Sequence, residues 1–232
     1  EVPSQALAAL AAPLPSVALD PRGCAASAVA TGGAGGLRAG LVAFDDNYMV
    51  YANGSAIVVI SISMGDYLLT RDVRGHAITA VNLAGGAVIT GDDDGFAQVW
   101  DVTSGRDVIG FSAGKGPVRA AALEVIAETW LAVLSVGELI VVHEVPRLSA
   151  EMDGEVPLPN SPNTSMPARV FELPGAATAV DLKVWPEQGM ILALTDAGAV
   201  YVCHISTGAV VPAAPSRDAP VASIALWAAP SP

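Results

Sequence analysis

The sequence is poor in residues that carry charge or covalent chemistry. Its two cysteines, Cys24 and Cys203, are too few for the disulfide framework of a small secreted domain. Lysine and arginine number 11 against 23 acidic residues, so the formal net charge is −12 and phosphate backbones should be repelled. No apolar run reaches the roughly eighteen residues that a membrane-spanning helix needs. We therefore expect an intracellular protein, in the cytoplasm or nucleus, that binds neither nucleic acid nor a membrane.

Patterns typical of enzymes and metal sites are incomplete. Residues 110–116 contain Gly and Lys but are one residue short of a phosphate-binding loop and lack its Ser or Thr. Residues 90–95 resemble a calcium loop, yet the first position is Thr and strands are expected on both sides. The histidines His76, His143 and His204 lie in or near expected strands, which favours core or surface roles over metal binding. We expect no enzymatic activity, no cofactor and no bound metal.

The chain is rich in short β-branched runs separated by turn residues. Residues 56–60 and 139–142 are continuous runs of this kind, and the chain contains 23 Gly and 17 Pro. Asn53-Gly54, Asp94-Gly95 and Thr207-Gly208 are typical turn dipeptides. Long helical periodicity is absent from the sequence. Together these features predict an all-β protein.

The runs recur with a period of about 40 residues, which is typical of repeat architectures. The expected strands at 56–62 and 96–102 lie about 40 residues apart, and the glycines and apolar residues around them recur at the same distance. A third unit ends at residues 137–145, and a fourth includes residues 178–180 and 198–208. The pairs with equal spacing are Gly65 and Gly105, Ile60 and Trp100, and Ile78 and Val118.

One unit has a fuller set of motif residues. It contains Gly75-His76, then Thr90-Gly-Asp-Asp-Asp94-Gly95, then Val99-Trp100-Asp101. This pattern closely resembles a WD40 repeat, whose four-stranded antiparallel blades build a β-propeller. The resemblance implies a hydrogen-bonded relay of His76, Thr90, Asp94 and Trp100. A buried imidazole and a buried indole N–H need such polar partners.

The other units depart from the WD40 pattern. Lys115-Gly116 stands where the next repeat would have Gly-His, and Pro174-Gly175 stands there in the fourth unit. Cys203 and His204 occupy the places of Trp and Asp. The relay is therefore expected in one repeat only.

The expected organisation is an N-terminal arm followed by blades. Residues 1–24 form the arm, and residues 25–232 hold about four blades and a partial one, in which residues 220–226 resemble a first strand. Residues 146–167 are rich in proline and read as an insertion, either a contact loop or a disordered decoration. A seven-bladed WD40 propeller needs roughly 300 residues, so we expect an incomplete part of a larger propeller, with a small closed propeller as the alternative.

WD40 proteins typically bind peptides or protein domains, so the resemblance implies a scaffold that mediates protein–protein interaction within a larger multiprotein assembly. The partners would be other protein subunits, and the acidic balance favours basic partner surfaces. Arg71, Arg74 and Arg119 flank expected strand ends and are candidate contacts. An alternative is a quinoprotein-type propeller dehydrogenase or a related secreted propeller protein, because residues 100–105 and 200–208 also resemble the strand-turn units of such propellers. Such an enzyme holds calcium and a quinone, so an absorption spectrum with calcium analysis distinguishes the two.

Overall fold

The computed structural model describes residues 41–73, 75–126, 129–146, 167–213 and 224. The expected N-terminal arm and the expected strand at 220–226, apart from Ile224, lie outside these residues. So does the proline-rich insertion, apart from its ends. Throughout the described part the chain forms strands and turns with two short 3₁₀ helices, which confirms the all-β prediction.

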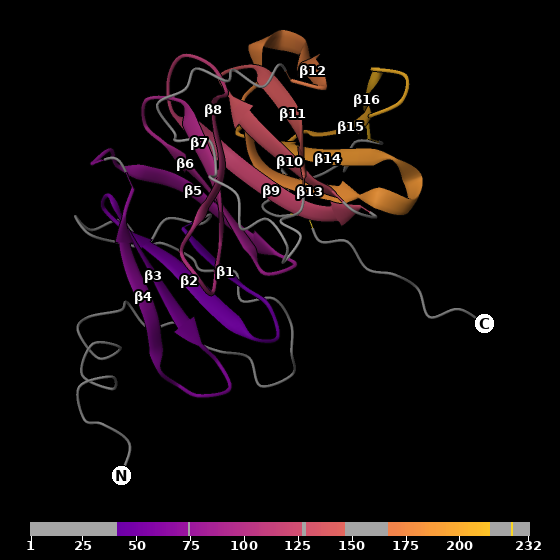
Figure 1. Ribbon diagram of the computed structural model, residues 1–232. Coiled ribbons are helices and arrows are strands. Elements are labelled where there is room, and N and C mark those ends of the chain that lie inside the picture. The colour runs from indigo at the N-terminus through magenta and orange to yellow at the C-terminus, as the bar shows by residue number, and fades with distance from the viewer. Residues whose placement is uncertain (1–40, 74, 127–128, 147–166, 214–223, 225–232) are drawn as a thin grey trace.

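In the described residues, sixteen strands form four antiparallel sheets of four strands each, consistent with a propeller-like fold. The sheets follow one another in chain order, from indigo to yellow (Figure 1). The first sheet comprises β1 (Val42–Phe44), β2 (Tyr48–Asn53), β3 (Ala56–Ser61) and β4 (Tyr67–Asp72). The second sheet comprises β5 (Ile78–Ala84), β6 (Ala87–Asp92), β7 (Phe96–Asp101) and β8 (Asp107–Ser112).

The remaining two sheets have the same simple meander order. The third sheet comprises β9 (Val118–Ile126), β10 (Thr129–Val136), β11 (Leu139–Pro146) and β12 (Arg169–Glu172). The fourth sheet comprises β13 (Ala179–Trp185), β14 (Met190–Thr195), β15 (Val200–His204) and β16 (Val210–Pro212), with 3₁₀ helices η1 (Pro174–Ala176) and η2 (Pro186–Gln188) before β13 and β14. The insertion predicted from the sequence therefore connects β11 to β12.

The 40-residue spacing corresponds to one sheet. Ile78 and Val118, which have this spacing, begin β5 and β9. The turns between the third and fourth strands of the first, second and fourth sheets have the same hydrogen bonds, in which a glycine N–H bonds to a carbonyl four residues earlier. These bonds are 2.9 Å long and join Gly65 to Ser61, Gly105 to Asp101, and Gly208 to His204.

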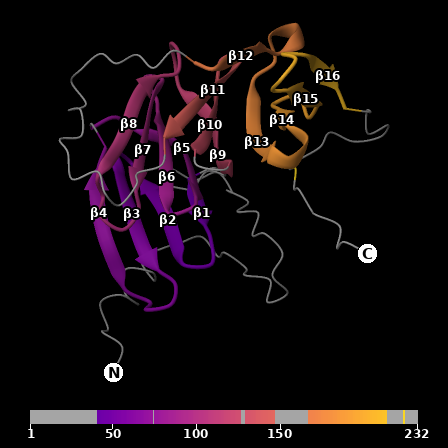
Figure 2. The same ribbon diagram turned by 45° about the vertical axis from the view of Figure 1, so that its right-hand side comes forward.

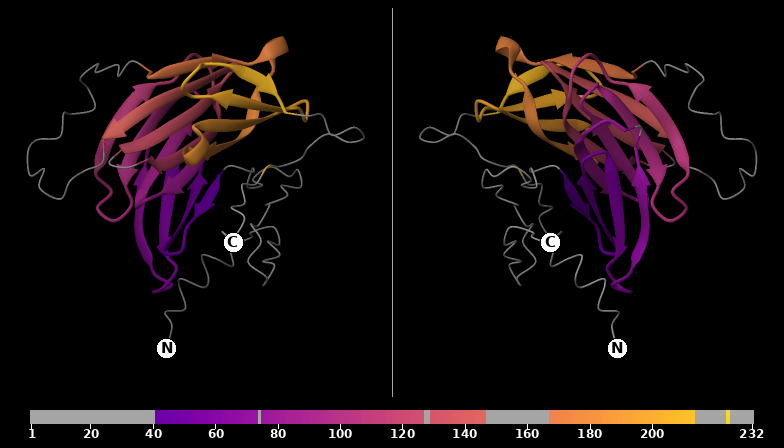
Figure 3. Two further views of the ribbon diagram at one scale, coloured as in Figure 1. Left: turned by 90° about the vertical axis from the view of Figure 1, so that its right-hand side faces the viewer. Right: turned by 90° about the vertical axis from the view of Figure 1, so that its left-hand side faces the viewer.

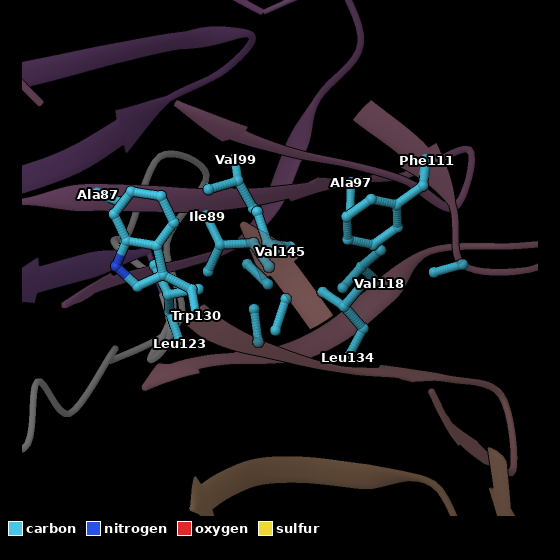
Figure 4. Packing of buried hydrophobic residues seen from close by; sticks show 14 of the residues in the cluster. Ala87, Ile89, Ala97, Val99, Phe111, Val118, Leu123, Trp130, Leu134 and Val145 are labelled. Carbon is cyan, nitrogen blue, oxygen red and sulfur yellow. The ribbon is translucent and has the colours of Figure 1, made fainter. Parts of the chain in front are cut away.

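Consecutive sheets pack face to face through three apolar clusters. Val50, Val59 and Trp100 belong to the cluster between the first and second sheets. The cluster between the second and third sheets includes Ile89, Phe111, Trp130 and Leu134 (Figure 4). Phe171, Leu182, Ile191 and Cys203 belong to the cluster between the third and fourth sheets. Among the described residues, none of the three clusters joins the first sheet to the fourth.

The views in Figures 2 and 3 show the same succession of sheets from other sides. Hydrogen bonds also join neighbouring sheets. Between the first and second sheets, Ile78 N–H donates to the Gly54 carbonyl in the β2–β3 turn at 2.8 Å. The Asn82 side-chain oxygen of β5 accepts a bond from Leu123 N–H of β9 at 3.1 Å. Such contacts fix neighbouring sheets, and the turns at the ends of their strands, relative to one another.

Candidate interaction surface

The structure does not join His76, Thr90, Asp94 and Trp100 into one buried network. His76 is at the surface, with its Nδ1 3.4 Å from Asp93 Oδ1, and the two side chains are 43% and 51% exposed. Thr90 Oγ1 donates to the backbone carbonyl of Gln98 at 3.4 Å. Asp94 is exposed. Within the described residues the Trp100 indole Nε1 has no hydrogen-bond partner. The described contacts therefore do not include the relay that the WD40 resemblance implies.

The buried carboxylate of this turn belongs to Asp92, which the sequence reading did not select. Asp92 is 2% exposed, and its Oδ1 accepts bonds from Asp94 N–H at 3.0 Å and Phe96 N–H at 2.8 Å. Asp93 N–H bonds to the Ala77 carbonyl at 3.0 Å, which brings Asp93 rather than Asp94 beside His76. Three consecutive aspartates thus take three different positions in one turn.

Trp100 is instead part of a contact between sheets. The Arg71 guanidinium of β4 lies 5.6 Å from the Trp100 ring centroid, a cation–π distance. The same guanidinium forms an ion pair with Asp107 and a hydrogen bond to the Gly105 carbonyl. Arg71, which the sequence suggested as a partner contact, is therefore engaged between the first and second sheets. Arg119 is exposed on β9, and Arg74 lies outside the described residues.

The next interface repeats this arrangement with other side chains. Phe111 pairs with the second residue of β7, as Arg71 pairs with the second residue of β3. The Phe111 ring stacks on the His143 ring, with centroids 4.0 Å apart. His143 is the fifth residue of β11, just as Trp100 is the fifth residue of β7. Phe171 has the equivalent place on β12 and shares a core cluster with Cys203. The same contact position therefore joins the first sheet to the second and the second sheet to the third.

Burial governs the protonation of the groups at this position. Burial lowers the pKa of His143, because the charged imidazolium loses its hydration. Burial raises the pKa of the Cys203 thiol to about 12, so Cys203 stays protonated. Both groups are neutral packing elements at pH 7.

An exposed apolar turn stands out at the end of the first sheet. Residues 62–68, here named the apolar turn, comprise the β3–β4 connection and the first two residues of β4, and they contain four exposed large apolar side chains. Met64 is 63% exposed and Ile62 is 49% exposed. Leu68 is the extra residue of a β-bulge, since Val59 pairs with Leu69 and Ile60 pairs with Tyr67. A bulge redirects the side chain of its extra residue away from the regular pleat.

The apolar turn borders a surface hollow of about 300 Å³. Met64, Leu68 and Tyr48 supply its large side chains, and Asn47, Ser61 and Ser63 supply polar groups from the same sheet. Thr103 of the β7–β8 turn completes the lining, so the hollow spans the first two sheets. We call this site the hollow below.

Hydrogen bonds hold the turns around the hollow in place. Asp45 Oδ1 accepts bonds from Asn47 N–H and Tyr48 N–H, both at 2.8 Å. Asp101 Oδ1 accepts bonds from the backbone and side chains of Thr103 and Ser104 at 2.7–3.1 Å. Burial alone would raise the pKa of Asp101, but the bonds from Ser104 and Thr103 outweigh it and the pKa is lowered. Asp101 is therefore ionised beside the hollow at neutral pH.

Among the described residues, no group of three or more His, Cys, Asp and Glu side chains is placed to hold a metal ion. No helix in the described part of the chain has the length and apolar character needed to cross a membrane.

No protein-family model matches the chain, and no curated protein matches it. Among solved structures, the chain is similar to the computationally designed Ika8 protein, with a TM-score of 0.52 and 20% identity over 72% of this chain. The match spans 46% of the Ika8 chain, less than half of its length. The computationally designed Ika4 protein also matches, with a TM-score of 0.49 and 18% identity over 76% of this chain and 95% of its own. At this identity the Ika8 likeness concerns the fold alone.

Proposed function

We propose that this protein is a non-catalytic scaffold that mediates protein–protein interaction within a larger multiprotein assembly. A fold by itself does not define a function, so the proposal rests on a particular surface. The observation that carries it is the apolar turn with its hollow, held on a firm stack of sheets. Contiguous exposed apolar groups beside polar ones are typical of protein interaction sites.

We further propose that the sheets are WD40-like blades that belong to a larger propeller. Three features support this: the 40-residue period, the equivalent turns after the third strands, and the Trp100-Asp101 pair at the end of β7. Each sheet packs against the next through an apolar cluster, as radially stacked blades do. Further blades, from the same polypeptide or from an associated protein, would cover the outer faces of the first and fourth sheets.

The proposed partners are other protein subunits with basic surfaces. The formal net charge of −12 favours such partners and opposes phosphate backbones. Specific interfaces combine an apolar centre with a polar rim, and the hollow and the carboxylates around it have this composition.

The test is purification of the tagged protein from its own cells under native conditions, followed by size-exclusion chromatography with light scattering. We expect a complex that contains at least one other polypeptide in a fixed molar ratio. The matched control is the variant Asp196→Ser, which changes an exposed residue of the β14–β15 turn and should keep the complex. A protein that elutes without any partner across a range of salt concentrations would contradict the proposed function.

A further inference from the structure

We propose that the hollow binds a partner segment in which one large apolar side chain is flanked by lysine or arginine residues. This inference rests on the proposed function and specifies the partner for the same surface. It follows from three properties of the hollow: its size, its charge and its fixed shape.

The size of the hollow suits one anchoring side chain. Its volume of about 300 Å³ is at the lower end of the range of ligand pockets, roughly 300–1,000 Å³. Met64 and Leu68 offer apolar contacts at one side, and thioether side chains adapt well to varied ligands. Binding energy at protein interfaces concentrates in a few such anchor residues. A leucine, methionine or aromatic side chain is therefore the expected occupant.

The charge around the hollow favours a cationic flank. The three turns that border it, at residues 45–47, 62–66 and 101–106, contain four carboxylates against one guanidinium, that of Arg106. The carboxylates belong to Asp45, Asp46, Asp66 and Asp101. Charge complementarity increases the association rate and excludes wrong partners. At the hollow, a second copy of this chain would present the same acidic turns and be repelled.

Hydrogen bonds within the protein fix the residues that line the hollow. Ser61 Oγ and Ser63 Oγ lie 3.2 Å apart within hydrogen-bond distance, and Ser61 Oγ accepts a bond from Met64 N–H at 3.4 Å. Thr103 is fixed on the opposite side by its side-chain bond to Asp101 Oδ1 at 2.7 Å. A preorganised site loses less conformational entropy on binding. The hollow can therefore bind a short segment without refolding.

The test is a fluorescence anisotropy titration of the full chain with labelled probe peptides. The main probe has a central Phe with two Lys on each side; matched probes replace Phe by Ala, or every Lys by Glu. We expect the main probe to bind, and each matched probe to bind at least about tenfold more weakly. Added salt should weaken binding of the main probe, because exposed charges are screened.

Two sets of variants locate the binding. Met64→Ser with Leu68→Ser should weaken the main probe by about tenfold, whereas Val211→Ser, an exposed apolar residue of the fourth sheet, should not. Asp46→Lys with Asp66→Lys should weaken it similarly, whereas Asp196→Lys, in the β14–β15 turn, should not. Circular dichroism melts of every variant check folding. Each pair of variants tests one property of the hollow separately.

The inference is overturned if no probe binds at about 1 mM, or if both double variants bind the main probe as well as the wild type does. Self-association that Leu68→Ser alone abolishes would instead assign the hollow to a second copy of the chain. The native complex separates this inference from the proposed function. If Met64→Ser with Leu68→Ser keeps its partner there, the scaffold function stands and the hollow is not its site.

Discussion

Three residues at equivalent positions help to pack neighbouring sheets against each other. Trp100 and His143 are the fifth residues of their strands, and Cys203 has the equivalent place on β15. Trp100 is covered from the preceding sheet by Arg71 and His143 by Phe111, and Cys203 belongs to the same apolar cluster as Phe171. The chemistry differs at each contact, but the shape requirement is the same: a side chain of the outer strand fills the space above the next sheet. The position is therefore one for packing, which explains how Cys can replace Trp there.

The first prediction compares two residues that the WD40 resemblance places in one relay. His76→Ala should change the free energy of unfolding by less than about 0.5 kcal/mol, because the histidine and its partner Asp93 are both well exposed. Trp100→Ala should cost about 3–5 kcal/mol, because the ring is fully buried between sheets. Chemical denaturation measures both values. A large loss of unfolding free energy for His76→Ala would instead support the relay.

The second prediction concerns acid stability through His143. Because its folded pKa lies below the unfolded value of 6.5, the unfolded chain binds more protons between the two values. His143 therefore contributes stability that is present above pH 6.5 and is lost as the pH falls through the folded pKa. His143→Phe should flatten the fall of unfolding free energy below pH 6.5, measured by denaturation at several pH values. An unchanged slope in His143→Phe would contradict this account.

Strands and turns were predictable from the sequence where their causes are local. The run of β-branched residues at 56–60 became β3, and the Asn53-Gly54 pair became the β2–β3 turn. The hollow was not predictable, because it depends on a bulge at Leu68 and on Thr103 from the next sheet. The buried carboxylate was also missed. Asp92, Asp93 and Asp94 are identical in chemistry, and only the backbone path decides which is buried.

The third prediction uses two glycines in equivalent turns of the first and second sheets. Both have positive φ, 65° at Gly54 and 82° at Gly95, so an alanine at either is strained by about 1–2 kcal/mol. At Gly95 an added Cβ would also lie 2.3 Å from the Gly114 carbonyl oxygen, whereas at Gly54 it would meet nothing within 4 Å. Gly95→Ala should therefore lower the melting temperature clearly more than Gly54→Ala. Equal losses of melting temperature would show that the β8–β9 loop can move away from the added methyl group without a loss of stability.

At the scale of the whole molecule, four equivalent sheets are joined by three apolar clusters. The sequence indicated about four units and a partial one, because the period is visible in glycines and apolar residues even where the motif residues are lost. The contacts between sheets could not be predicted in the same way, since Arg71, Phe111 and Phe171 have no common chemistry. Whether the sheets belong to a WD40-like propeller stays a proposal, supported by one repeat that matches the motif.

The last prediction follows from the two sheets at the ends of the stack. The first and fourth sheets expose large apolar side chains, among them Phe44 at 54%, Val180 at 45% and Val211 at 41%. Unpaired strand edges and apolar faces favour association with another chain. The purified chain should therefore bind an apolar fluorescent dye and show a mass above 23.4 kDa by light scattering. Phe44→Ser with Val211→Ser should reduce both signals, whereas Met64→Ser should leave the mass unchanged, because the hollow is not the self-association surface. A monomer that unfolds cooperatively without binding dye would show that these faces need no cover.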